Sequence, residues 1–186
     1  MKRLFDLVLA LIVAGLLIVP IVVISVLVKL TSKGLILHWS DRVGMNNTIF
    51  RMPKFRSMKM ETPAVATHLL VDPGSVLTPI GGFLRKSSLD ELPQLWCIMK
   101  GNMSFVGPRP ALFNQGDLIA LRTEKGVDKL LPGLTGWAQV NGRDELPIQE
   151  KVNLDEEYME RESLRFDIYI LWLTVLKVLR RDGITH

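Results

Sequence analysis

The stretch LTPIGGFLRKSSLDELPQLWCIMKGNMSFVGPRP, residues 77–110, predicts two short helices followed by a strand. Thr78-Pro79 is a helix-start signal, and we expect the first helix to end near Ser87. At the far end, SFVGPRP predicts a strand that runs into a rigid turn, because each proline fixes its own φ. The segment between them sets the position of a pair of carboxylates.

Asp90 and Glu91 are placed by the proline that follows them. If Ser88 were the N-cap, Pro93 would fall at the fifth helical position and remove a hydrogen bond. If Asp90 is the cap, Pro93 lies in the first turn, where its missing N–H costs nothing. We therefore expect the two acids at a helix N-terminus.

This second helix should present one apolar face. Leu92, Leu95, Trp96 and Met99 follow the spacing i, i+3, i+4 and i+7, which brings their side chains to the same side. Gly101 then predicts the end of the helix, because glycine readily adopts the left-handed conformation found there.

A membrane segment is predicted at the front of the chain. Leu7–Val28 is 22 residues without a charged side chain, and about 20 apolar residues suffice to cross a bilayer core. The run lacks the cleavage site of a secretory signal, so we expect a retained anchor. Pro20 predicts a kink inside it, and basic residues flank both ends, which permits both ends to be cytoplasmic.

Composition restricts the class of protein. The 186 residues suffice for one domain with a substantial core, and 48% of them are hydrophobic. A single cysteine, Cys97, excludes an intramolecular disulfide and a cysteine metal cluster, as is typical of a reducing cytoplasm. P-loop, HExxH, G-x-S-x-G and D-x-D motifs are absent, which excludes several common enzyme classes.

A basic segment follows the anchor. From Arg42 to Lys59 there are five basic residues and no acid, within a region, Gly34 to Met60, that predicts a short hairpin. With a formal net charge of +4, the protein suits an anionic partner: nucleic acid, lipid headgroups or a phosphorylated substrate. The nearby membrane segment favours the latter two, and there is no nucleic-acid recognition module.

The remainder predicts a mainly helical α/β (α+β) fold with short strands. Glu61–Ser75 is expected to be a loop, Gln149–Glu162 a polar helix, and Ile168–Arg181 an amphipathic helix too short to span a bilayer, which lies on the membrane or packs in the core. We expect an anchor of helix, kink and helix over residues 1–33 and a cytoplasmic catalytic domain over residues 34–186.

Two features carry the candidate chemistry. Acids in a first helical turn, here Asp90 and Glu91, complement the helix dipole without any catalytic role. The same position lowers a carboxylate pKa and attracts phosphate, and two adjacent carboxylates suit Mg²⁺ shared with a phosphate. Arg109, fixed between two prolines, suits bidentate phosphate binding or is a solvated loop residue, and Arg85 adds positive charge.

Four segments together resemble a known family. KRLFDLVLALIVAGLLIVP, KFRSM, the stretch 77–110 and PGLTGWAQVNGRD occur in an order and spacing similar to the small, catalytic-core type of bacterial monotopic phosphoglycosyl transferase. The resemblance covers Lys2 to about Gly183. It implies transfer of a sugar-1-phosphate from a UDP-sugar to polyprenol (undecaprenyl) phosphate with release of UMP, the first membrane step of glycoconjugate biosynthesis.

The resemblance also implies roles for individual residues. Asp90 would be the nucleophile that forms a covalent phosphosugar intermediate, and Glu91 would serve metal coordination or proton handling. Both would be ligands of Mg²⁺, with Arg85 and Arg109 on the phosphates. The candidates for uridine contacts are Lys54, Arg56, Lys59 and Arg143.

The same resemblance implies a place in the cell. A re-entrant helical hairpin would hold the protein on the cytoplasmic face of the bacterial inner membrane, in contact with membrane lipid. The family often has serine before the membrane proline, where this sequence has Val19 ahead of Pro20.

A function from another class stays open beside this one. A membrane-anchored module that binds anionic lipid or a protein, without turnover, would explain the anchor, the basic segment and the last helix. It gives no reason for Asp90-Glu91 or for the Pro-Arg-Pro turn.

Overall fold

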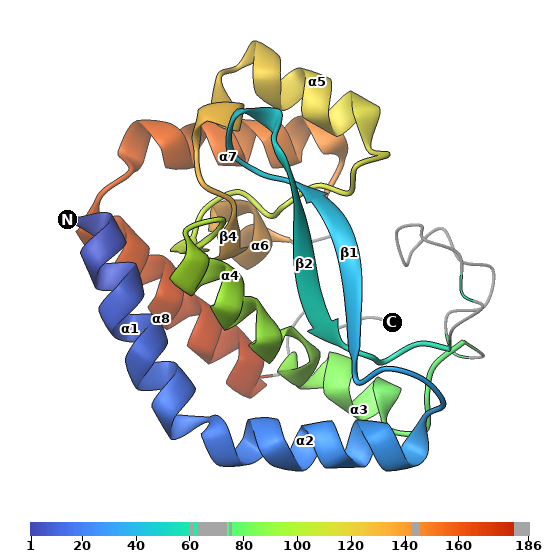
Figure 1. Cartoon of the computed structure of the whole chain (residues 1–186). Helices are drawn as coiled ribbons and strands as arrows, with labels where there is room; N and C mark the ends of the chain where they lie inside the picture. Colours follow the sequence, from blue (N-terminus) through green and yellow to red (C-terminus); the bar gives the residue numbers. More distant parts are fainter. Residues whose placement is uncertain (60–61, 63–73, 75, 143–145, 181–186) are drawn as a thin grey trace.

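The computed structural model describes residues 1–59, 62, 74, 76–142 and 146–180, and it is mainly helical with two small sheets. The α-helices are α1 (Lys2–Leu16), α2 (Ile18–Thr31), α3 (Gly81–Lys86), α4 (Leu95–Lys100), α5 (Gly116–Glu124), α6 (Trp137–Asn141), α7 (Ile148–Arg161) and α8 (Leu164–Arg180). The strands are β1 (Leu37–Val43), β2 (Ile49–Phe55), β3 (Ser104–Val106) and β4 (Gly133–Thr135), and the 3₁₀ turns are η1 (Met45–Asn47), η3 (Leu89–Gln94) and η4 (Val127–Lys129). In Figure 1, α1 and α2 form an L along one side and the bottom of the molecule.

The two helices of the predicted anchor meet at a bend of 62°. α1 ends at Leu16, and the break is at Leu17. Pro20 explains this position, because it has no N–H for the carbonyl of Leu16 and its ring would clash with that carbonyl in a straight helix. Within the described residues neither helix alone is long and apolar enough to cross a bilayer, whereas the bent pair passes the same test together.

The predicted hairpin is present. β1 and β2 pair antiparallel, with Leu37 opposite Phe55 and Val43 opposite Ile49. The connection contains Asn46 at a φ of 54°, a left-handed conformation that asparagine tolerates better than most residues. The hairpin carries the basic residues of β2 toward η3, on which β2 packs.

The segment that contains the two acids differs from the expected helix. Ser88 has a φ of 56° and precedes η3, so Asp90 lies inside a 3₁₀ turn and is not an N-cap. α4 begins only at Leu95. The physical reason is Pro93, which lies within η3 and cannot donate a backbone hydrogen bond, so the regular α-helical ladder starts after it.

The side chains predicted to share one apolar face do not all pack in the same hydrophobic cluster. Leu95 belongs to the main core, whereas Leu92 packs against a second cluster around α2 and α3. Trp96 is 50% exposed, with the Lys100 ammonium above its ring. Gly101, at a φ of 89°, ends α4 as predicted.

A short parallel pair, β3 and β4, sets the start of the Pro-Arg-Pro turn. Gly107 donates its N–H to the Thr135 carbonyl (2.9 Å), and Gly133 donates to the Pro108 carbonyl (2.9 Å). A Cβ on Gly107 would lie 2.3 Å from the Leu131 carbonyl oxygen, so only glycine allows this approach of the two backbones. The turn at Arg109 therefore leaves the sheet from a fixed point.

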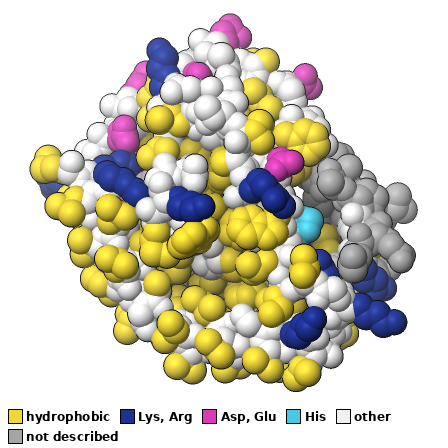
Figure 2. All heavy atoms as spheres, in the orientation of Figure 1, with side chains coloured by type: hydrophobic (Ala, Val, Ile, Leu, Met, Phe, Trp, Pro, Cys, Tyr) yellow, Lys and Arg dark blue, Asp and Glu magenta, His cyan; other side chains and the backbone are white. Residues whose placement is uncertain are grey.

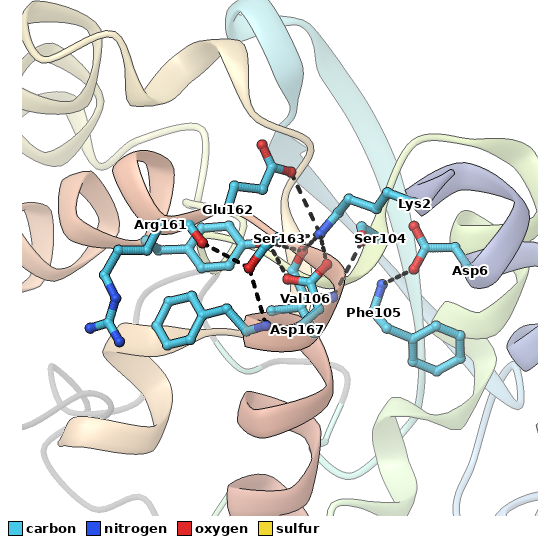
Figure 3. A network of polar contacts seen from close by, with 11 residues as sticks. Lys2, Asp6, Ser104, Phe105, Val106, Arg161, Glu162, Ser163 and Asp167 are labelled. Atoms are coloured by element: carbon cyan, nitrogen blue, oxygen red, sulfur yellow. Dashed lines mark hydrogen bonds and ion pairs between the residues drawn. The ribbon is translucent and has the colours of Figure 1, made fainter.

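The first turn of α1 is bound to the far end of the chain (Figure 3). Lys2 Nζ donates to Asp167 Oδ2 (2.6 Å), to the Tyr158 hydroxyl (2.7 Å) and to the Val106 carbonyl (3.0 Å). The Tyr158 hydroxyl donates in turn to Asp167 Oδ1 (2.7 Å). Burial and this acidic neighbour raise the pKa of Tyr158, so its hydroxyl keeps its proton.

Arg3 and Asp6 also hydrogen-bond α1 to distant parts of the chain, α4 and β3. The Arg3 guanidinium donates to the carbonyls of Ile98 (2.5 Å) and Met99 (2.8 Å) in the last turn of α4, where helix carbonyls lack partners. Asp6 Oδ1 accepts from the Phe105 N–H (3.1 Å). α1 thus shares its core with the rest of the chain, and the division at residue 33 stays a prediction.

α8 is both packed and exposed. It begins at Leu164, four residues before the predicted start. Ile170 is fully buried, whereas Tyr169 and Trp172 on the other side are half-exposed.

Figure 2 shows hydrophobic side chains gathered over the lower part of the molecule, around α1 and α2, and acidic side chains mainly in the upper half. Most of the expected loop 61–75 lies outside the described residues.

Candidate active site

A cavity of about 490 Å³ lies beside η3, within the size range of about 300–1,000 Å³ usual for small-molecule sites. Its polar part is lined by Lys54, Arg85, Ser88, Asp90, Glu91 and Arg109. Its apolar part is lined by Leu9, Val13, Leu92, Leu95, Phe105, Leu134, Leu171, Val175 and Val178, with Thr135, Gln139 and Thr174 among them. The cavity is therefore amphipathic: its charged side chains come from β2, α3, η3 and the Pro-Arg-Pro turn, and most of its apolar side chains come from α1 and α8.

Asp90 lies in the charged part and is only 6% exposed. Burial raises the pKa of its carboxyl above the ordinary value, and the cations Lys54, Arg85 and Arg109 oppose that rise. This differs from the lowered pKa expected at a helix N-terminus, because Asp90 lies within a 3₁₀ turn in a site where loss of water outweighs the helix dipole.

Glu91 joins two of these cations. Its Oε1 lies 2.6 Å from Lys54 Nζ and 3.5 Å from Arg109 Nη2. Lys54 comes from β2 and Arg109 from the Pro-Arg-Pro turn, so one carboxylate brings together side chains from separate parts of the fold. The arrangement concentrates positive charge next to Asp90, as an anionic substrate requires.

The backbone of Arg109 is held by a buried ion pair that sequence reasoning missed. Arg122 on α5 donates from Nη1 to the Arg109 carbonyl (2.8 Å) and lies 2.6 Å from Asp155 Oδ2 on α7. Burial raises the pKa of Asp155, and the Arg122 guanidinium beside it opposes that shift. Asp155 is one acid among several in α7, so the sequence offers no signal that singles it out.

Comparison with known proteins identifies the family of this chain. A family model described as bacterial sugar transferase matches residues 1–181. The chain belongs to the bacterial sugar transferase family. It is 40% identical to the uncharacterized sugar transferase EpsL of Bacillus subtilis, over 99% of this chain and 90% of that protein. The resemblance stated from the sequence motifs is thereby confirmed.

Larger relatives match over the same region. The chain is 42% identical to the UDP-glucose:undecaprenyl-phosphate glucose-1-phosphate transferase of Escherichia coli, over 95% of this chain and 40% of that protein. It is 37% identical to the undecaprenyl-phosphate galactose phosphotransferase of Salmonella typhimurium, over 98% of this chain and 41% of that protein. The chain therefore spans about two-fifths of these two relatives.

The cavity is lined by most of the site residues expected from the sequence. The five that line the cavity are Asp90, Glu91, Arg85, Arg109 and Lys54.

The other candidates lie elsewhere. Arg56 donates to the Lys33 carbonyl (2.9 Å) and does not line the cavity. Lys59 is also outside the lining, and its N–H donates to the Val76 carbonyl (2.8 Å). Arg143 lies outside the described residues. Pro20 is at the bend of the anchor.

The donor set suits a metal ion only together with a substrate. Within the described ranges no three acidic, histidine or cysteine side chains form a metal cluster. Asp90 and Glu91 supply two carboxylates at the cavity, which fits Mg²⁺, because this ion is commonly held by one or two carboxylates and completed by phosphate oxygens and water.

Proposed function

We propose that this protein transfers a sugar-1-phosphate from a UDP-sugar to polyprenol phosphate and releases UMP. The observation that carries the proposal is a buried carboxylate, Asp90, beside three cations at a cavity that continues into hydrocarbon. A charged, phosphate-bearing donor and an apolar acceptor both find matching surfaces there. The E. coli and Salmonella relatives are named for the same class of transfer.

In the proposed reaction Asp90 acts as nucleophile in two displacements at one phosphorus. A carboxylate oxygen of Asp90 attacks the sugar-bearing phosphorus, and the bond from this phosphorus to the bridging oxygen breaks, so that UMP leaves. The product is an aspartyl phosphosugar. A phosphate oxygen of the polyprenol phosphate then attacks the same phosphorus and returns Asp90 to a free carboxylate.

The surrounding side chains make an anionic nucleophile compatible with an anionic substrate. Lys54, Arg85 and Arg109 lower the cost of charge on Asp90 and offer donors to phosphate oxygens. Glu91 holds Lys54 and Arg109 beside the cavity. We propose that Glu91 acts through these two cations as well as through a metal ion.

We propose Mg²⁺ as the cofactor, held by Asp90 and Glu91 together with the diphosphate of the donor. When bound, the ion supplies positive charge that neutralises the diphosphate. The support is the pair of adjacent carboxylates and their place at the cavity. Loss of turnover in EDTA, restored by added Mg²⁺, is the expected result, and full activity in chelator would contradict it.

We propose that the protein lies in the cytoplasmic leaflet of the bacterial inner membrane. The support is the exposed apolar surface of α1 and α2, which includes Leu4, Leu11, Leu16, Val19, Val22 and Leu30. Half-exposed aromatic side chains on α4 and α8, Trp96 and Trp172, suit the headgroup region, where Trp is enriched. Both ends of the bent pair return to the same body, because Lys2 binds Asp167 and α2 leads into β1.

A UMP-release assay tests the reaction. Purified protein is incubated with a panel of UDP-sugars, with and without undecaprenyl phosphate, beside an Asp90→Asn variant. We expect at most one UMP per protein without acceptor, a phosphosugar adduct on Asp90 by mass spectrometry, and steady turnover when acceptor is added. A protein that binds anionic vesicles but releases no UMP from any donor would instead be a binding module.

A further inference from the structure

We infer that the apolar part of the cavity is the binding site for the first isoprenoid units of the lipid acceptor, with the acceptor phosphate at Lys54, Arg85 and Arg109. This inference rests on the proposed function and deepens it, because it assigns the space between α1 and α8 to the acceptor and not to the nucleotide.

The two sides of this space are hydrocarbon. Leu9 and Val13 contribute from α1, and Leu171, Val175 and Val178 contribute from α8. None of these side chains offers a hydrogen bond. A sugar or a base placed there would lose its bonds to water without replacement, whereas an isoprenoid chain loses none.

The hydroxyl groups in this part of the cavity are already engaged. Thr174 Oγ1 donates to the Ile170 carbonyl (2.8 Å), so the proton between Thr174 and Thr135 (2.7 Å) comes from Thr135. Neither hydroxyl then has a proton for a ligand.

The remaining amide of the lining is engaged through its nitrogen, whereas its oxygen has no hydrogen-bond partner among the described residues. Gln139 Nε2 donates to the Leu134 carbonyl (3.3 Å), and its Oε1 is fully buried next to Gly136. A nucleotide therefore finds few partners among these side chains, and an apolar chain needs none.

The order of charge and hydrocarbon matches an amphiphile with an anionic end. Asp90 lies among the cations, so an acceptor phosphate that attacks a phosphosugar on Asp90 must lie there too. Its chain then has one apolar direction to follow, between α1 and α8. At the rim Val175, a lining residue on α8, is 57% exposed. The lining thus continues into the outer apolar surface, where the rest of a long chain would enter lipid.

The two walls are fixed to each other at one end. Lys2 in the first turn of α1 bonds Asp167 in the first turn of α8 at 2.6 Å. Arg3 anchors the same turn of α1 to the C-terminal end of α4. The spacing of the walls is therefore set by the protein before a ligand arrives, which lowers the entropy cost of binding.

The first test narrows the cavity from the α1 side. Val13→Phe should raise the KM for undecaprenyl phosphate by about tenfold or more and leave the KM for the UDP-sugar within about twofold. Ile12→Phe is the matched control, because Ile12 is adjacent on α1 but outside the lining. We expect both its constants to stay near those of the wild type. Wild-type UMP release in the same experiment reports on the proposed function separately.

Two outcomes of this test overturn the inference. Equal acceptor constants for Val13→Phe and Ile12→Phe would show that the chain binds elsewhere. A raised KM for the UDP-sugar alone would assign the cavity to the donor.

A second test needs no substitution in the cavity. A prenyl phosphate with a diazirine in its first isoprene units is irradiated with the wild-type protein in micelles. Labelling near Leu9 and Val13 and near Leu171 and Val175, suppressed by excess undecaprenyl phosphate, is the expected result. Suppressible labelling confined to α2 would overturn the assignment, whatever the result with Val13→Phe.

Discussion

Asp90 is a carboxylate in a site that disfavours its charge. Burial raises its pKa, and three cations only partly compensate. A nucleophile needs to be ionised, so the site has conflicting requirements for stability and for reaction. The conflict leads to a prediction in which activity and stability change in opposite directions.

We predict that Asp90→Asn nearly abolishes turnover, by about a thousandfold or more, because an amide does not replace the nucleophile. The same variant should be more stable than the wild type at neutral pH. Because the folded pKa is raised, the folded state holds its proton above pH 3.8, where the unfolded state loses it, and stability falls as pH rises. Thermal melts in detergent between pH 4 and 8 measure the effect.

The difference in melting temperature between Asp90→Asn and the wild type should vanish well below pH 3.8 and widen as pH increases through the folded pKa. A shift of about 2–4 °C corresponds to about 1 kcal/mol for a chain of this size. An active Asp90→Asn variant would exclude the covalent route. A variant less stable at pH 7 would show that the cations outweigh burial.

Arg109 gives a second prediction at this scale. Arg109→Ala should lower kcat/KM for the UDP-sugar by about tenfold or more, because it removes a phosphate donor and a partner of Glu91. Arg109→Lys should recover only part of the loss, since lysine lacks the planar fork. Arg165→Ala on the exposed start of α8 is the control and should change stability by at most about 0.5 kcal/mol. Near-normal kinetics of Arg109→Ala would make Arg109 a solvated loop residue.

At the scale of elements, the pair Arg122–Asp155 connects α5 and α7 to the Pro-Arg-Pro turn. We predict that Arg122→Met or Asp155→Leu alone destabilises the protein by about 3–5 kcal/mol, because each leaves an unpaired buried charge. The double variant should lose less than the sum, since both charges are gone. Urea unfolding of the four proteins measures the coupling.

The same cycle separates stability from positioning. Arg122 also donates to the Arg109 carbonyl, and the double variant does not restore that bond. The kcat/KM of the double variant should therefore stay low even where its stability is recovered. Its KM for the UDP-sugar should stay raised while its melting temperature returns toward that of the wild type. Additive stability costs, or full recovery of kinetics in the double variant, would contradict this role.

Local signals in the sequence predicted the elements that depend on local chemistry. The alternation of apolar and basic residues predicted the hairpin β1–β2, and Gly101 predicted the end of α4. The helix start at Asp90 was wrong, because a 3₁₀ turn holds Pro93 as easily as a first α-turn and the two are alike in sequence. α5 was not predicted, and the Arg122–Asp155 pair was missed because its bonds join positions 33 residues apart.

The site shows the same division. Asp90, Glu91 and Arg109 were candidates because adjacent carboxylates suit a shared metal ion, an arginine between two prolines suits phosphate, and the family resemblance implied their roles. The structure brings all three to the cavity. The apolar lining from α1 and α8 was not predicted, because Leu9, Val13 and Leu171 look like any membrane or core residue until the fold brings them together. Burial of Asp90, which determines the direction of its pKa, is a property of the folded chain.

For the whole molecule, the bent pair α1–α2 predicts how the protein sits in a bilayer. In a Cys97→Ser background, a cysteine added before Met1 and a Lys33→Cys variant should both be labelled from the cytoplasmic side only. The reason is that Lys2 and β1, at the two ends of the pair, contact the same body. Cys97 is 2% exposed and burial raises its pKa to about 11, so its removal serves only to exclude background.

Pro20→Leu extends this experiment. A straight helix over the same residues would exceed the hydrocarbon core of about 30 Å, so the added cysteine should become accessible from the periplasm. Turnover should fall with it, because Lys2 would be separated from Asp167. Labelling of the unsubstituted anchor from the periplasmic side would show that the pair spans.

The bond between Lys2 and Asp167 also constrains the order of events during synthesis. Its partners are 165 positions apart, so at about 5–20 residues per second the second partner leaves the ribosome roughly ten to thirty seconds after the first. Throughout that interval α1 has no α8 to pack against, and its apolar side chains lack part of the core that they share in the folded chain. On the membrane placement proposed above, the nascent chain therefore reaches the bilayer before its cavity is complete, and α8 closes the cavity on a protein that is already in place.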